Sequence, residues 1–147
     1  MAIGDIKTRV MKPGDLPDIV DIDKKVLGKE RREYWESKLE RSKHDSPITP
    51  LVAEVDGKVV GFIIGSASWY EYGVPENIGW VDTIGVDPGF QRKGVAKALM
   101  DELLTNLKMI DVESVYTMVN WREGELLSFF DAMGFEKGDM INLQKKI

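Results

Sequence analysis

The residues with the clearest chemical signal lie where an apolar, strand-like run meets a run with helical spacing. Gln91, Gly94 and Ala96 stand at the spacing Gln-x-x-Gly-x-Ala, with the cations Arg92 and Lys93 between them. The first turn of a helix carries free backbone N–H groups and the positive end of the helix dipole. Small residues there let a bulky anion approach the backbone. The spacing predicts a pyrophosphate cradle; the alternative is a surface turn with two solvated cations.

Ten elements must position this segment, and their predicted order is βααβββαβαβ. A hairpin with Asp56-Gly57 at its turn, followed by a βαβ crossover, favours an α/β (α+β) fold with a mixed central sheet flanked by helices. The length of 147 residues fits a single domain over 1–147. The expected strands cover 6–10, 51–55, 58–68, 80–86, 114–119 and 140–145, and the expected helices cover 16–27, 31–43, 94–108 and 126–133.

Composition narrows the classes of function. The chain has no cysteine, which excludes disulfides, thiolate metal sites and a cysteine nucleophile. Its net charge of −5 argues against nucleic acid as the partner. The one histidine, His44, lies in a polar loop, and no cluster has metal-ligand spacing, so we expect no metal. Without a membrane-length apolar run or a signal pattern at the start, we expect no membrane partner and a cytoplasmic location.

The spacing Gln91-x-x-Gly94-x-Ala96 resembles the acyl-CoA-binding motif of the GNAT family of N-acetyltransferases, whose consensus is Gln/Arg-x-x-Gly-x-Gly/Ala. The predicted order of elements is similar to the GNAT fold over essentially the whole chain. A second family motif, Asn…Phe-Tyr…Gly-Phe, is similar to the C-terminal run from Asn120 to Phe135.

The resemblance implies acetyl-CoA as the co-substrate and assigns it a set of contacts. Ile84 and Val86 bond the pantetheine arm and the acyl carbonyl through their backbones, and a strand bulge near Gly85 would suit the splay of this strand. The resemblance also implies that Asn120 contacts the pantetheine and that two aromatic residues line the thioester end. The pyrophosphate contacts are Gln91, Arg92, Lys93, Gly94, Val95 and Ala96, and the aromatic residues are Phe129 and Phe130.

Acyl transfer to an amine needs a base, because the amine is cationic at neutral pH. Asp82 lies two and four residues before Ile84 and Val86, so regular alternation would place all three on one face. Apolar neighbours could raise the pKa of its carboxyl group. Glu71, on an aromatic and acidic loop, is the second candidate. The alternatives are a structural Asp82 that binds a backbone N–H or a cation, and a solvated Glu71.

Two features depart from the family pattern. Phe130 stands where many members carry a tyrosine that acts as a general acid, and phenylalanine cannot donate a proton. Asn120 stands 14 residues before Gly134, which is longer than the usual spacing. A thiol with a pKa near 8.5 is a competent leaving group, so the thiolate can also leave unaided.

The sequence therefore predicts an acetyl-CoA-dependent N-acetyltransferase that transfers the acetyl group directly, in a ternary complex, to a primary amine. The closeness in sequence of Glu71, Glu76 and Asp82 favours a cationic acceptor, either a small amine or a peptide amine. The alternative is an acyl-CoA-binding sensor or regulatory module without transfer activity. A nucleotide-binding module is a third option. The oligomeric state stays open, with a homodimer as one option.

Overall fold

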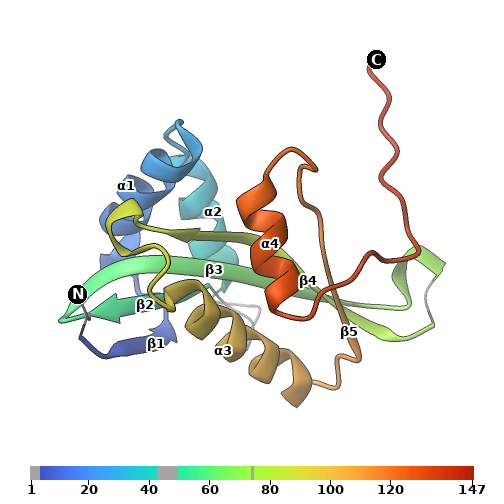
Figure 1. Cartoon of the computed structure of the whole chain (residues 1–147), viewed down its shortest axis with the longest axis horizontal. Coiled ribbons are helices and arrows are strands. Elements are labelled where there is room, and N and C mark those ends of the chain that lie inside the picture. The colour runs from blue at the N-terminus through green and yellow to red at the C-terminus, as the bar shows by residue number, and fades with distance from the viewer. Residues whose placement is uncertain (1–3, 43–49, 74) are drawn as a thin grey trace.

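The computed structural model describes residues 4–42, 50–73 and 75–147, and His44 lies outside them. Its core is one five-stranded sheet in the order β1-β2-β3-β4-β5 (Figure 1). Neighbouring strands run antiparallel, except that β4 and β5 are parallel. The strands are β1 (Ile6–Val10), β2 (Leu51–Val55), β3 (Lys58–Trp69), β4 (Asn77–Val86) and β5 (Ser114–Thr117).

Helices cover both faces of this sheet, as Figure 1 shows. One face packs against α1 (Leu16–Leu27) and α2 (Arg32–Ser42). The other packs against α3 (Val95–Met109) and α4 (Gly124–Ala132). Within the described ranges, none of the helices is long and apolar enough to cross a bilayer.

The two faces have separate cores. Under α3, the side chains of Leu99, Leu103 and Leu107 pack against the sheet, and all three are fully buried. This helix lies close because glycine faces it: a Cβ at Gly65 would come within 2.6 Å of Leu103. Such close packing fixes where the start of α3 sits relative to the end of β4.

Under α1 and α2, an aromatic pair forms the centre of the second core. Trp35 and Phe62 are both buried, with ring centroids 4.6 Å apart. Tyr34, next to Trp35, is only half buried and lies at the edge of this core. The core therefore holds Trp35 in place and leaves Tyr34 able to contact a ligand.

The predicted mixed α/β architecture is confirmed, with boundaries that differ by a few residues. The exception is the predicted strand over 140–145, which is wrong: the structure assigns no strand beyond β5 in the described residues. The alternating pattern of this segment is that of a strand, but a strand also needs a neighbour to complete its backbone hydrogen bonds. This chain does not supply that neighbour to its own C-terminal segment.

Candidate functional site

A cleft of about 1280 Å³ lies at the end of β4, between the N-termini of α3 and α4 and the C-terminal part of α1. Its floor is the β4 segment Thr83–Val86. Its walls include Gln91, Arg92, Gly94 and Ala96 at the start of α3. This volume is above the usual range for small-ligand pockets, about 300–1,000 Å³, and suits a long ligand. The structure thus brings the predicted cradle and the predicted strand edge into one cavity.

The floor of the cleft exists because β4 and β5 separate. Their parallel pairing covers only Ile78–Val81 of β4. At the last paired position, the hydroxyl of Thr117 donates to the carbonyl oxygen of Val81 at 3.0 Å. Beyond this point β4 continues to Val86 with β3 alone as its neighbour among the described residues. The backbone groups on its open edge are therefore available to a ligand.

A β-bulge marks the point of separation, and it lies at Asp82. Ile64 of β3 pairs with Thr83, whereas the next residue of β3, Gly65, pairs with Val81, so Asp82 has no residue opposite it. The prediction of a bulge near Gly85 is wrong by three residues, because Gly85 keeps a regular partner. A bulge bends its strand and increases the local twist, which fits the divergence of β4 from β5.

The bulge also changes which face each side chain occupies. Ile84 and Val86 pack into the core under α3. Asp82 points to the opposite face, where the Oγ atom of Ser66 donates to its Oδ1 atom at 3.2 Å. The prediction that these three side chains share one face is therefore wrong, because an extra residue in the strand shifts the alternation by one.

The surroundings of Asp82 suit a group that exchanges a proton with water. Burial of the carboxylate raises its pKa, and the charge of Lys38 and the Ser66 hydroxyl oppose this rise in part. The residue as a whole nevertheless keeps contact with solvent. A carboxylate with a raised pKa that can still reach water meets both requirements of a general base.

Tyr34 of α2 belongs to the same electrostatic environment. Burial raises the pKa of its phenol; the guanidinium of Arg31 lowers it, and the charges of Asp82 and Asp23 raise it further. Arg31 lies 4.3 Å from the centre of the ring and donates two hydrogen bonds to Asp23, at 2.8 and 2.9 Å. Asp23 and Arg31 also line the cleft. The junction of α1 and α2 thus places polar groups between the cleft and Asp82.

The cradle at the start of α3 is built from two left-handed backbone positions. Gly94 caps the helix with a φ angle of 90°, and Arg92 has a φ angle of 61°. The side chain of Gln91 turns back and donates from Nε2 to the Val86 carbonyl at 3.0 Å. Gln91 therefore ties the cradle to the floor of the cleft.

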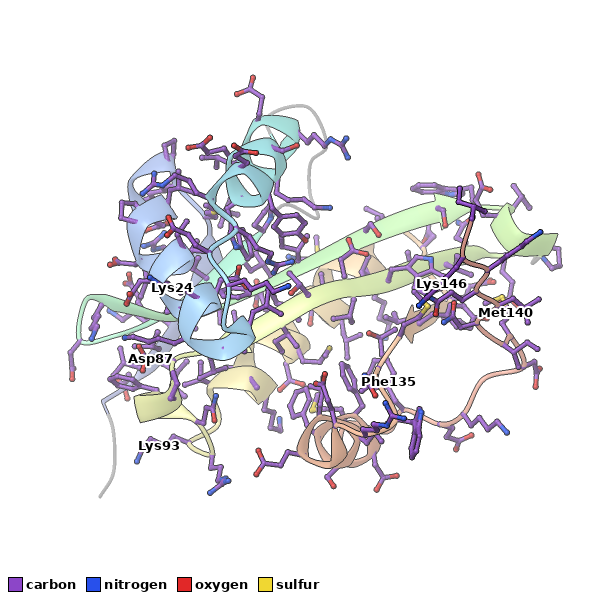
Figure 2. The ribbon with its side chains drawn as sticks, turned by 90° about the horizontal axis from the view of Figure 1, so that it is seen from above. Lys24, Asp87, Lys93, Phe135, Met140 and Lys146 are labelled. Atoms are coloured by element: carbon purple, nitrogen blue, oxygen red, sulfur yellow. The ribbon has the colours of Figure 1, made fainter. Side chains whose placement is uncertain are left out.

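Asp87 stabilises the turn that connects these two parts. Its Oδ1 atom accepts a hydrogen bond from the Gly89 N–H at 2.9 Å, and Lys25 of α1 lies 3.4 Å from its Oδ2 atom. Burial alone would raise the pKa of Asp87, but the bonds to Gly89 and Lys25 outweigh it and the pKa is lowered. Figure 2 shows Asp87 beneath α1 at the end of β4, with the Lys93 side chain pointing outward.

The remaining cradle residues present different groups. The guanidinium of Arg92 is highly exposed and binds Glu125 of α4 at 2.9 Å, across the mouth of the cleft. Lys93 is also exposed, and Val95 is buried beneath the helix start. Neither Lys93 nor Val95 lines the cleft. Val95 can therefore contribute only its backbone.

The residues of the second motif that were predicted to contact acetyl-CoA lie in different environments. Phe129 lines the cleft, but Phe130 is 5% exposed and packs between Phe129 and Phe135 in the core. Asn120 accepts a hydrogen bond from the Arg122 N–H at 3.0 Å and does not line the cleft. Of these three residues, the geometry places only Phe129 at the cavity.

Glu71 lies far from Asp82. It belongs to a short 3₁₀ turn, η2 (Glu71–Gly73), between β3 and β4. This turn is at the far end of the long hairpin (Figure 1), and Glu71 does not line the cleft. About five residues of extended strand, roughly 16 Å, lie between Asn77 at the start of β4 and Asp82. The structure therefore does not gather these carboxylates into an acidic mouth.

Comparisons with known proteins identify the family of the chain. The model of the acetyltransferase (GNAT) family matches residues 16–135. A protein named acetyltransferase ECA0875, from Pectobacterium atrosepticum, is 29% identical over 112 residues, which are 76% of this chain and 74% of that protein.

Solved structures show the same fold. Aminoglycoside N-acetyltransferase AAC(6')-Iy, in complex with CoA, superposes with a TM-score of 0.83 at 17% identity, covering 97% of this chain and 95% of that one. Ard1 from Thermoplasma volcanium superposes with a TM-score of 0.75 at 27% identity, covering 89% of this chain and 82% of that one. The chain belongs to the GNAT family of acetyltransferases.

Proposed function

We propose that the protein binds acetyl-CoA in the cleft and transfers the acetyl group directly to a primary amine in a ternary complex. The observation that carries this proposal is the end of β4–β5 pairing at Val81, because it opens a strand edge that leads to the N-terminus of α3. A strand edge can hold an extended amide-bearing chain, and the helix start can hold phosphates. Acetyl-CoA contains both.

Each group in the cleft has a role in this proposal. The backbone amides from Arg92 to Ala96 hold the pyrophosphate, and the open edge at Ile84 and Val86 holds the pantetheine arm. A backbone N–H of that edge stabilises the oxyanion that forms on the acetyl carbonyl. Phe129 covers the apolar side of the cavity.

Asp82 acts as the base in this proposal, directly or through water. The amine nitrogen attacks the thioester carbon once its proton has passed to the carboxylate, the C–S bond breaks, and CoA leaves as a thiolate or thiol. Because the chain has no cysteine, direct attack is favoured over an acyl-enzyme on a thiol. Phe130 cannot protonate the leaving group, so departure as a thiolate is the simplest course.

The acceptor in this proposal is an amine that reaches the face of β4 below α2. Asp82 and the half-buried phenol of Tyr34 lie there, with Lys38 as the nearby cation. The related structure of AAC(6')-Iy belongs to an aminoglycoside acetyltransferase. An acceptor screen should compare small cationic amines with peptide amines.

Calorimetric titration with acetyl-CoA tests the cleft. Gly94→Glu introduces a side chain and a negative charge at a left-handed position of the cradle, and should weaken binding at least about 100-fold. Gly14→Glu is the matched control, because it makes the same change in charge at an exposed site with no heavy atom within 4 Å. No binding by the native protein, or equal affinity of the native protein and Gly94→Glu for acetyl-CoA, would contradict this assignment of the cleft.

ATP serves as a second ligand in the same titration. Equal affinity of the native protein for ATP and for acetyl-CoA would favour a nucleotide-binding module.

Release of free CoA thiol with a panel of amines tests the transfer. The second candidate, an acyl-CoA sensor, is favoured by one observation: Phe130 has no hydroxyl group and is buried in the core. Tight binding of acetyl-CoA without thiol release for any amine or peptide would support the sensor. Thiol release that depends on the amine would support the enzyme.

A further inference from the structure

The sheet face that carries Asp82 continues beyond the second core as a polar and aromatic surface. The core under α1 and α2 reaches Ile64 of β3, and the β3–β4 hairpin extends past this point (Figure 1). Ser66 lies opposite Trp80 in the register, and opposite residues share a face. Because Ser66 also bonds Asp82, Trp80 lies on the same face as the proposed base. Neither Ser66 nor Trp80 lines the acetyl-CoA cleft, so this surface is separate from it.

Two aromatic rings form the apolar part of this surface. Tyr116 of β5 is the neighbour of Trp80 in the parallel register, and the two ring centroids lie 5.5 Å apart with their planes tilted by 37°. Both residues are partly exposed. Partly exposed rings of this kind offer a platform for an apolar or aromatic group of a ligand. The platform lies beside Asp82, because Trp80 precedes Asp82 by two residues on one strand.

One side of α2 supplies a cation to the same region. Lys38 follows Tyr34 by four residues, and its Nζ atom lies 5.5 Å from the centre of the Tyr34 ring. The charge of Lys38 lowers the pKa of Asp82, and the charge of Asp82 raises the pKa of Tyr34. The salt bridges between described side chains do not include a pair of Lys38 and Asp82. The ammonium group and the carboxylate are therefore near each other without direct contact.

The charges in this region disfavour an acceptor with several ammonium groups. Arg31, which also lies against the Tyr34 ring, already binds Asp23. Glu71 lies at the far end of the hairpin. A polycation would meet the cation Lys38 beside the carboxylate that receives its amine. An acceptor that carries one positive and one negative group would satisfy both charges.

We propose that the acceptor is an α-amino acid with an apolar or aromatic side chain, bound as a zwitterion between β4 and α2. Its ammonium group lies at Asp82 and its carboxylate lies at Lys38. Its side chain lies on the rings of Trp80 and Tyr116. An α-amino acid carries opposite charges on one carbon atom, which suits two protein charges that are near each other without contact. Lys38, Trp80 and Tyr116 are thus specificity-determining residues.

This proposal rests on the proposed function, because Asp82 is the base for the same amine. The ammonium group loses one proton to Asp82 before the attack and a second, after it, to the leaving thiolate or to water. The N–C bond forms, and the C–S bond breaks with its electron pair on the sulfur of CoA. The products are an N-acetylamino acid and CoA.

A set of matched acceptors tests the recognition of charge. Phenylalanine, phenylalaninamide and phenethylamine share the amine and the ring, but only phenylalanine carries a carboxylate. The readout is the ratio of kcat/KM for phenylalanine to that for each analogue, measured by release of CoA thiol. Lys38→Met should lower this ratio at least about 10-fold, because a charge-assisted bond to the carboxylate is lost. Any effect of Lys38 on Asp82 acts on all three amines and cancels in the ratio.

Two further variants serve as controls for this ratio. Lys38→Arg keeps the charge and should keep most of the preference for phenylalanine. Lys24→Met removes the same charge from an exposed site of α1 that does not line the cleft, and it should leave the ratio unchanged. A native ratio that Lys38→Met retains would overturn the proposal, as would native turnover of the neutral analogues without turnover of phenylalanine. Absence of thiol release with every amine would instead contradict the proposed function itself.

Substitution of one ring tests the platform. Tyr116→Leu removes the ring but keeps an apolar side chain, and it should lower kcat/KM for phenylalanine about 5-fold more than for glycine. Tyr116→Phe keeps the ring and should behave as the native protein. Calorimetry with acetyl-CoA checks that the cleft of each variant is intact. Equal losses for glycine and phenylalanine in Tyr116→Leu would overturn the assignment of the side chain to these rings.

Discussion

The two halves of β4 have almost the same composition but different surroundings. Residues Ile78–Val81 are paired on both edges, with β3 and with β5. The half that follows, up to Val86, keeps β3 but has no neighbour on its other edge in the described residues. Asp82 stands between the halves as the extra residue of a bulge. One inserted residue thus separates a structural half from a half that can bind a ligand.

The bulge has two structural effects. It bends β4 away from β5, which opens the cleft, and it shifts the alternation of side chains by one residue. The shift places Asp82 on the face of α2, while Ile84 and Val86 stay in the core under α3. Asp82 is therefore adjacent in sequence to the open edge that would hold the acetyl donor. Its carboxylate, which would receive a proton, nevertheless lies on the opposite face of the sheet from the side chains of Ile84 and Val86.

Removing the carboxylate at the bulge has the largest expected effect. Asp82→Asn should lower kcat about 100-fold or more while the affinity for acetyl-CoA stays the same, because a general base contributes about 10²–10⁴ to the rate. Rates from thiol release and affinities from calorimetry separate the two quantities. Equal loss of affinity would indicate that the substitution damages the cleft, and unchanged kcat at every pH would reject Asp82 as the base.

The same variant should be more stable at neutral pH. The folded state raises the pKa of Asp82, so it binds the proton more tightly than the unfolded chain does. The stability that this group contributes is present below its unfolded pKa, about 3.9, and is lost as the pH rises through the higher folded value. The thermal midpoint of Asp82→Asn should therefore exceed the native midpoint at pH 7 and approach it in acid. A lower midpoint at pH 7 would contradict the raised pKa.

A side chain at Gly85 should destabilise the fold at the second half of β4. A Cβ atom there would overlap the buried ring of Phe62, so Gly85→Ala should cost about 1–3 kcal/mol of unfolding free energy. Gly14→Ala is the matched control, since no heavy atom lies within 4 Å of its new methyl group. Denaturant unfolding measures both. Equal stabilities would show that the second core accommodates the change.

Asp87 should show the opposite dependence on pH. Burial raises its pKa, but the Gly89 N–H and Lys25 lower it more, so the net pKa is below its usual value. Its contribution is present above the unfolded pKa and is lost as the pH falls through the folded value. Asp87→Asn should cost about 1 kcal/mol at pH 7 and nothing in strong acid. A constant difference across this range would contradict the assignment.

Removing the Ser66 hydroxyl has the smallest expected effect. Its hydrogen bond lowers the pKa of Asp82, so Ser66→Ala should raise that pKa and move the acid limb of the kcat profile to higher pH. The maximum rate at high pH should change little. A profile that does not move would mean that another group controls the acid limb.

Local sequence patterns predicted most of the elements and several residues that line the cleft. Alternation, helical spacing and the Asp56-Gly57 turn follow from local backbone geometry, so they predicted β2 and β3, the start of α3 and the mixed fold. The spacing of Gln91, Gly94 and Ala96 likewise predicted residues that do line the cleft. These features depend on neighbours within a few residues.

Local sequence patterns could not predict the features that depend on which strands meet. The bulge at Asp82 is defined by the register of β3 against β4, and no local pattern carries that register. Burial of Phe130 and the remoteness of Glu71 depend on packing between distant segments. Segment 139–147 has the sequence pattern of a strand. A strand forms only beside another strand, because its backbone hydrogen bonds join neighbouring strands and do not lie within the segment.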